Sequence, residues 1–272
     1  MKANTKSLLL RLLVHLSIII TTTTTLSLLG YILYKGMPHI NIGLFSINYT
    51  SENSSLLPAL INTISIVAIS LLISVPIGIF SAIHFVEYTH KDNKFVKIMR
   101  SATETLQGIP SIVYGLFGYL FFVTAIFKTY CLIAGAFTLA IIILPLIIRT
   151  TEEALKSVPD SLRESSFALG AGKLQTVFKI VLPSAANGIF AGIVLAIGRI
   201  IGETVALVYT AGSVAQISKS LFSSGRTLSV HMYSLWTEGL KAEQSYATAV
   251  ILIITVFILN LTAEHISRKI KR

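Results

Sequence analysis

The sequence has few charged residues and almost no cysteine. Only 12% of its 272 residues are Asp, Glu, Lys or Arg, about half the share of soluble domains, while 53% are hydrophobic. The mean hydropathy is +0.77. The single cysteine, Cys131, excludes an internal disulfide and a thiolate metal cluster, and the six histidines show no paired metal-binding spacing. This composition excludes a soluble enzyme and a disordered protein, and it indicates no metal site.

The apolar residues gather in runs long enough to cross a bilayer. A membrane-spanning helix needs about 20 apolar residues, with a lower limit of about 17. The sequence therefore predicts an all-α membrane protein with six transmembrane helices embedded in membrane lipid. We expect the spans at residues 12–34, 59–86, 109–127, 131–148, 187–212 and 246–264.

The spans divide the chain into three parts. Residues 1–55 hold an uncleaved anchor helix and a polar external loop, because no small-residue cleavage site follows the first apolar run. The other five spans form one core over residues 56–265, with a long polar connection at 149–185. A basic tail at 266–272 ends the chain.

The basic residues predict the orientation in the membrane. Loops rich in Lys and Arg stay on the cytoplasmic side. Of the 22 basic residues, sixteen lie at the N-terminus, in the connections 87–108 and 149–185 and in the tail, whereas five lie in the opposite loops. We therefore expect both termini in the cytoplasm. The basic cytoplasmic loops then account for the net charge of +10, which implies no nucleic-acid partner.

The long polar connection has the pattern of two short amphipathic helices. Apolar residues recur at helical spacing over 162–169 and again over 174–181, and glycines interrupt them at 170–172. We expect Gly170 to allow a backbone reversal and Pro183 to end the second helix. An exposed apolar face of this kind requires a soluble partner, and a helix lying on lipid headgroups is the alternative.

Arg199 and Glu203 place two charges inside the fifth expected span. A charge at the bilayer centre costs about 2.5–3.5 kcal/mol on insertion scales, so such residues face a bundle interior. Because they are four residues apart, we expect them to share a helix face and partly neutralise each other. The planar guanidinium of arginine matches a tetrahedral oxyanion, which favours an anion gate over a structural ion pair. Small residues predict close helix packing around this face, at Gly188, Gly192, Gly198 and Gly202.

The polar connection resembles the loop of ABC importer permease subunits. The family motif is Glu-Ala-Ala, three residues, Gly, nine residues, Ile, one residue and Leu-Pro. The matching residues are Glu164, Gly170, Ile180, Leu182 and Pro183, with Ser165 and Ser166 replacing the alanines. The resemblance implies the type I ABC importer permease fold, an ABC permease core at 56–265, and docking of this loop on a separate ATPase subunit.

The fifth span narrows this resemblance to the phosphate-specific permeases. Their Arg-x-x-Gly-Glu-Thr segment is matched by Arg199, Gly202, Glu203 and Thr204, and residues 108–118 resemble their third span. The resemblance implies import of inorganic phosphate along a pathway that includes Arg199, Glu203 and Thr204.

The resemblance also implies partners and a location. Residues 152–155 and the chain length favour the PstA type of permease subunit. Such a subunit pairs with a PstC-type permease, a PstB-type ATPase dimer and an extracytoplasmic phosphate-binding protein in the bacterial plasma membrane. The alternatives are a permease for another oxyanion, such as sulfate or phosphonate, and the PstC-type subunit itself.

The residues give no catalytic centre and no cofactor site. The Gly-Ala-Gly-Lys run at 170–173 lacks the earlier glycine and the following Ser or Thr of a phosphate-binding P-loop. We expect Glu104, Glu152 and Glu153, at the membrane edges, to be solvated charges. The chain is therefore predicted to be a transport subunit, with ATP hydrolysed by another chain.

Overall fold

The computed structural model describes residues 2–89, 93–237, 239 and 241–270, which form helices and no strand. Five helices are long and apolar enough to span a membrane, and a bent pair raises this to six. The five are α1 (Lys2–Gly36), α2 (Leu57–Ile83) continued by the π-turn η3 (His84–Tyr88), α5 (Leu132–Lys156), α7 (Lys173–Thr176) continued by η5 (Val177–Val181) and α8 (Leu182–Gly202), and α11 (Ala242–Ile270).

The remaining elements are short or bent. The third expected span, 109–127, corresponds to α4 and η4, which reach spanning length only together with α3 across a bend of 100°. Pro110 lies at this bend as the N-cap of α4, where its missing N–H costs no helical hydrogen bond. The short elements are η1 (Met37–His39), η2 (Ile42–Phe45), α3 (Lys94–Gly108), α4 (Ser111–Gly118), η4 (Tyr119–Phe127), α6 (Asp160–Ala168), α9 (Val205–Thr210) and α10 (Leu228–Thr237).

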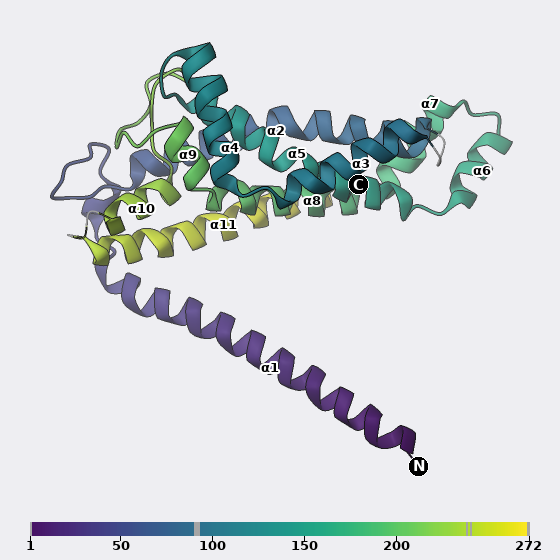
Figure 1. Ribbon diagram of the computed structural model, residues 1–272, viewed down its shortest axis with the longest axis horizontal. Coiled ribbons are helices and arrows are strands. Elements are labelled where there is room, and N and C mark those ends of the chain that lie inside the picture. The colour runs from purple at the N-terminus through teal and green to yellow at the C-terminus, as the bar shows by residue number, and fades with distance from the viewer. Residues whose placement is uncertain (1, 90–92, 238, 240, 271–272) are drawn as a thin grey trace.

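The helices α2, α5, α8 and α11 run side by side along the long axis of the molecule (Figure 1). α6 and α7 lie at one end of this bundle and α10 at the other. The C-terminal end of α1 contacts the start of α11, and the rest of α1 extends away from the bundle as a separate arm (Figure 1). The spanning stretch of α1 is not buried by the rest of the chain. Its apolar side chains therefore remain free to face lipid or another subunit.

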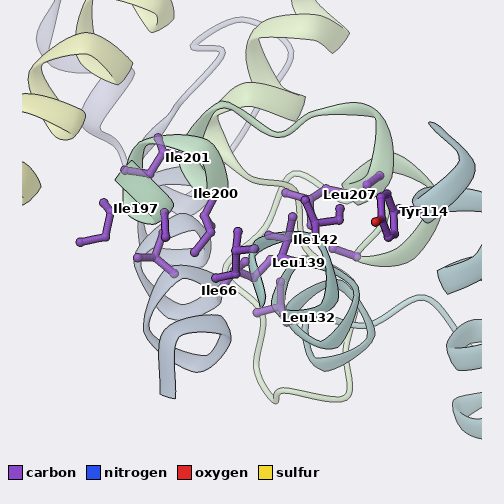
Figure 2. Packing of buried hydrophobic residues seen from close by; sticks show 14 of the residues in the cluster. Ile66, Tyr114, Leu132, Leu139, Ile142, Ile197, Ile200, Ile201 and Leu207 are labelled. Carbon is purple, nitrogen blue, oxygen red and sulfur yellow. The ribbon is translucent and has the colours of Figure 1, made fainter. Parts of the chain in front are cut away.

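α5 is the central helix of the core. A Cβ added at Gly78 of α2 would lie 2.6 Å from Cγ2 of Ile147, so the missing side chain lets α2 approach α5 closely. The hydroxyl of Ser70 in α2 donates to the carbonyl of Ala136 in α5 at 3.1 Å, within the same buried contact. Figure 2 shows this core with α5 in the middle, labelled at Ile66, Tyr114, Leu132, Leu139, Ile142, Ile197, Ile200, Ile201 and Leu207.

Candidate functional site

The fifth expected span is interrupted beside its charged residues. α8 ends at Gly202, Glu203 takes an extended backbone with φ −72° and ψ 126°, and α9 begins at Val205. The expectation of one continuous helix over 187–212 is therefore wrong. Arg199 lies in the last turn of α8, about 25 Å from its start at 1.5 Å per residue, and thus near the α10 end of the bundle.

Glu203 bonds to neighbouring elements instead of Arg199. Its carboxylate accepts the N–H of Ala206 in the first turn of α9 at 3.4 Å, and its main-chain carbonyl accepts the Ser229 hydroxyl of α10 at 2.6 Å. A carboxylate is favourable there because the first N–H groups of a helix lack helical partners. Among the described residues, no ion pair joins Arg199 to Glu203. The expectation that the two residues share a helix face is wrong, because α8 ends at Gly202 and Glu203 is extended.

Arg199 lies on a face of α8 that its own chain leaves open. Its side chain makes no hydrogen bond or ion pair within the described part of the chain, and it is exposed. The nearby polar hydroxyl of Tyr114 in α4 is already committed, because it donates to the carbonyl of Leu106 at 2.7 Å. A Cβ added at Gly198 or Gly202 would meet no atom within 4 Å. The close packing expected at these two glycines is therefore absent within the described residues.

The other two glycines of α8 pack against α5. A Cβ at Gly188 would lie 2.6 Å from Cβ of Ala154, and one at Gly192 would lie 2.7 Å from Cβ of Thr150. Real Cβ atoms do not approach so closely, so these positions need glycine for the observed helix spacing. The prediction of close helix approach is confirmed for this half of the glycine series.

Thr204 borders a cavity between α1, α9, α10 and α11. The cavity has a volume of about 390 Å³, and its lining includes Tyr233, Trp236 and Tyr246. The hydroxyl of Thr204 donates to the carbonyl of Gly202 at 3.3 Å. Thr204 thus belongs to the same helix break as Glu203, but it lines a largely apolar cavity.

The polar connection folds into two short helices, as its periodicity predicts. α6 and α7, with the turn between them, form a two-helix segment (residues 160–176) at one end of the bundle (Figure 1). Gly170 has φ +82°, a left-handed conformation that glycine adopts without strain, and its N–H donates to Phe167 at 2.9 Å. The buried hydroxyls of Ser166 and Thr176 lie 2.8 Å apart and join the two helices.

Pro183 does not end the second helix. α7 passes through the π-turn η5 directly into α8. In that turn the N–H of Leu182 donates to the carbonyl of Val177, five residues earlier, and Pro183 in the first turn of α8 has no N–H to satisfy. The expected connection 149–185 is shorter in the structure, because α5 continues to Lys156 and the next helix begins at Lys173.

The two-helix segment exposes apolar side chains. Leu169 is 89% exposed and Leu174 is 66% exposed, and Leu162 and Phe167 are also exposed, as is Phe178 in the following turn η5. Large apolar side chains exposed together on one short segment are typical of an interaction surface. The motif residues take mixed positions: Glu164, Gly170 and Pro183 are exposed, whereas Ile180 and Leu182 are half-buried.

The charged residues near this end form ion pairs that the sequence did not predict. The Glu152 side chain is only 9% exposed, and its Oε1 lies 2.6 Å from both Arg100 Nη2 of α3 and Lys156 Nζ. The expectation that Glu152 is solvated is wrong, because α3 covers it. In the sequence, the burial of Glu152 is indicated by its position three residues before Leu155, on the buried face of α5. Arg163, half-buried in an ion pair with Glu87, carries no indication of this pairing in the sequence beyond its charge.

Buried polar groups also lie at the opposite end of the bundle. The guanidinium of Arg226 lies 4.5 Å from the centre of the Tyr49 ring. His231 in α10 is fully buried, and its Nε2 lies 3.2 Å from the Ser54 carbonyl. Burial, and secondarily the charge of Arg226, lower the pKa of His231 to about 3. In the part of the chain that is described, no three His, Cys, Asp or Glu residues lie close enough to hold a metal ion.

Sequence comparison places the chain among transport permeases. Residues 74–272 match the family described as binding-protein-dependent transport system inner membrane component. The probable ABC transporter permease protein YqgI of Bacillus subtilis is 33% identical over 260 residues, which cover 87% of this chain and 86% of that protein. The phosphate transport system permease protein PstA of Haemophilus influenzae is 34% identical over 249 residues, which cover 91% and 88%.

Solved structures show the same fold. A bacterial ABC transporter involved in the import of alginate, an acidic polysaccharide, has a TM-score of 0.67 at 17% identity, over 96% of each chain. An inward-facing MetNI methionine ABC transporter has a TM-score of 0.62 at 22% identity, over 80% of this chain and 94% of the other. These matches confirm the predicted ABC importer permease fold.

A transporter of this kind works with a separate ATPase and a binding protein. The match covers most of the chain, and the relatives align over nearly their whole length. The chain belongs to the binding-protein-dependent ABC transporter permeases, as a multi-pass membrane subunit that is not itself an ATPase.

Proposed function

We propose that the chain is the PstA-type permease subunit of an ATP-driven inorganic phosphate importer. It pairs with a PstC-type permease, a PstB-type ATPase dimer and an extracytoplasmic phosphate-binding protein in the bacterial plasma membrane, with both termini in the cytoplasm. The relatives named PstA support this substrate, as does the Arg-x-x-Gly-Glu-Thr segment beginning at Arg199.

The unpaired guanidinium of Arg199 is the observation that carries the proposal. A charge in a spanning helix is costly without a partner, and a phosphate oxyanion offers the acceptors that a guanidinium fork matches. The carboxylate of Glu203 is bonded to α9 and therefore does not compete for Arg199. The open space beside Gly198 and Gly202 leaves room for an anion and for the second permease subunit.

The pathway residues in this proposal are Arg199, Glu203 and Thr204. Arg199 contacts the anion, Glu203 maintains the helix break, and the Thr204 hydroxyl lies at the same break. Release of the anion requires weak binding. One arginine in a hydrated pathway binds an anion more weakly than an enclosing set of donors does.

The two-helix segment is the ATPase docking surface in this proposal. Its exposed apolar residues fill a groove on the ATPase, and the motif residues Glu164, Gly170, Ile180, Leu182 and Pro183 shape the segment and its return into α8. A soluble partner removes from water the side chains that the fold leaves exposed, including Leu169 and Leu174.

Uptake of radiolabelled phosphate tests the substrate. Cells lacking this gene, complemented with the wild-type chain, are measured at limiting phosphate with excess sulfate or phosphonate as competitors. We expect the wild-type chain to restore uptake that only unlabelled phosphate competes away. Restored uptake of sulfate or phosphonate without phosphate would contradict the phosphate assignment.

A further inference from the structure

Both halves of the two-helix segment contact the same five-residue turn at the end of α2. Arg163 of α6 donates from Nη2 and Nε to Oε1 of Glu87 in η3, at 2.8 and 3.1 Å. The two side chains are 14% and 9% exposed, so water screens this pair little. Lys173 of α7 places its Nζ 5.1 Å from the centre of the Tyr88 ring, the next residue of η3.

The same guanidinium also bonds the end of α5. Arg163 Nη2 donates to the carbonyl of Leu155 at 2.9 Å, and Nη1 donates to the carbonyl of Val158 at 2.8 Å. Carbonyls at a helix C-terminus have few helical donors, and the guanidinium supplies further ones; the Leu155 carbonyl also accepts the N–H of Val158 at 3.3 Å. One side chain of α6 thereby joins α2 and α5.

An apolar cluster joins the same helices as this ion pair. Ala82 and Ile83 of α2 pack with Leu155 of α5 and with Val177 and Val181 of η5, and all five are buried. Apolar contact is non-directional and allows helices to slide, whereas a guanidinium fork bonded at several points fixes an orientation. The cluster therefore holds the elements together, and Arg163 fixes their relative positions.

The chain connectivity leaves α2 without a direct link to the two-helix segment. The segment follows α5 and precedes α8 in the chain, so its movement passes covalently into both. α2 is followed instead by η3 and α3, and only non-covalent contacts connect it to the segment. A π-turn such as η3 is a common site of local rearrangement in helices.

We propose that the Arg163–Glu87 pair, supported by Lys173 against Tyr88, is the joint that transmits movement of the two-helix segment to α2. Arg163 and Glu87 are positioning residues: they contact neither substrate nor nucleotide, and they keep α2 moving together with α5 and α8 when the ATPase closes. This role rests on the proposed docking of the ATPase at the segment, but it does not depend on the identity of the anion.

The first test compares two carboxylate-to-amide variants in the complete transporter, reconstituted in proteoliposomes. Glu87→Gln replaces the negative charge opposite Arg163 with a neutral amide and so weakens the pair. Glu153→Gln is the matched control, because its pair with Arg149 lies at 3.1 Å on one exposed helix face. We expect Glu87→Gln to retain the ATPase and its hydrolysis while phosphate moved per ATP falls about fivefold or more, and Glu153→Gln to match wild type. An unchanged ratio for Glu87→Gln would overturn the proposal.

The second test is independent of the substrate. Spin labels at His84→Cys in η3 and Ser165→Cys in α6 report the distance across the joint, and Cys131, the only native cysteine, is buried. We expect this distance to stay constant between nucleotide-free and ATP-trapped transporter, and to change on trapping in the Glu87→Gln background. A distance that stays the same between nucleotide-free and ATP-trapped transporter in Glu87→Gln would contradict the proposed joint, whichever anion is transported.

A conservative variant separates the joint from general misfolding. Arg163→Lys retains the charge but loses the forked bonding to Glu87 and the two carbonyls. We expect its coupling ratio to lie between those of wild type and Glu87→Gln, with normal assembly. A wild-type coupling ratio in Arg163→Lys would contradict the forked joint. If wild-type proteoliposomes carry no phosphate, the phosphate assignment fails while the distance measurement still decides this proposal.

Discussion

Arg199 and Glu203 are four residues apart, yet they take separate roles at the end of α8. Arg199 is exposed and unpaired within the described residues, whereas the Glu203 carboxylate bonds the first turn of α9. The sequence marks both as unusual charges inside a span, but in the structure Arg199 lies in the last turn of the spanning helix and Glu203 follows its end at Gly202. The sequence does not reveal their separation, because that depends on the extended backbone at Glu203.

Replacing Arg199 tests its contact with the anion. Arg199→Gln removes a charged donor, and a hydrogen bond to a charged group contributes about 1.5–3 kcal/mol, or roughly 10- to 150-fold. We therefore expect phosphate uptake to fall by about that factor in complemented cells. Lys219→Gln, at an exposed loop position, serves as the control and should match wild type.

Glu203→Gln distinguishes a helix cap from an ion pair. The amide oxygen of glutamine still accepts the Ala206 N–H, so a capping role predicts near wild-type uptake. An essential ion pair predicts a loss as large as that of Arg199→Gln. Equal losses in the two variants would show that the separation of Arg199 from Glu203 does not describe the working transporter.

His231 predicts a pH dependence of stability. Its pKa is about 3 in the folded chain and about 6.5 when unfolded, so the unfolded state binds the proton first as pH falls. The stability it contributes is complete above pH 6.5 and is lost progressively towards pH 3, by about 2 kcal/mol at pH 5.

The measurement for His231 is thermal unfolding of the purified protein in detergent at pH 7.5 and pH 5. His231→Phe cannot be protonated, so we expect its melting temperature to shift less between these pH values than that of wild type. Equal shifts would mean that His231 is not buried as a neutral imidazole.

At the level of helices, hydropathy predicts which segments are helical but not where they bend. The long apolar runs give the spanning helices α1, α2, α5 and α11. The bend before α4, the break at Glu203 and the π-turn before Pro183 depend on packing against other helices. Periodicity within one segment carries no information about those neighbours. The sequence therefore marks helix boundaries near Pro110 and Pro183, but it gives neither the 100° bend, nor the π-turn, nor the break at Glu203.

The contact between α5 and α8 gives a prediction with an internal control. Gly188→Ala places a Cβ 2.6 Å from Cβ of Ala154, which no rotamer change can relieve. We expect it to lower the free energy of unfolding by about 1–3 kcal/mol. Gly198→Ala, in the same helix, meets open space and should stabilise the helix by up to about 1 kcal/mol.

The measurement for this contact is thermal unfolding of the purified subunit in detergent, comparing the two alanine variants with wild type. Two variants of equal stability would indicate that α5 and α8 are not packed as closely as their glycines allow.

At the scale of the whole molecule, the sequence predicted the transporter family better than the contacts between its helices. The loop motif spans twenty residues at fixed spacing, so it identified the ABC permease fold. The Arg163–Glu87 and Arg100–Glu152 pairs join segments distant in sequence, and either glutamate alone resembles a solvated charge. Such pairs become visible only when the helices are assembled.

The two-helix segment predicts how the subunit joins the ATPase. Leu169→Glu puts a charge on a side chain that is 89% exposed, so the fold of the subunit should tolerate it. A charge buried in an apolar groove is strongly unfavourable, and we expect loss of ATPase co-purification with normal membrane insertion. Lys219→Glu, in a loop outside the two-helix segment, is the control. Retained ATPase in Leu169→Glu would contradict docking at this surface.

The most direct measurement is phosphate accumulation in proteoliposomes that contain the complete transporter, with the phosphate-binding protein on one side and ATP on the other. We predict accumulation against a gradient that needs hydrolysable ATP, is competed only by phosphate and is strongly reduced by Arg199→Gln. Accumulation that continues with a non-hydrolysable ATP analogue, or that is unaffected by Arg199→Gln, would contradict an ATP-driven phosphate pathway through this subunit.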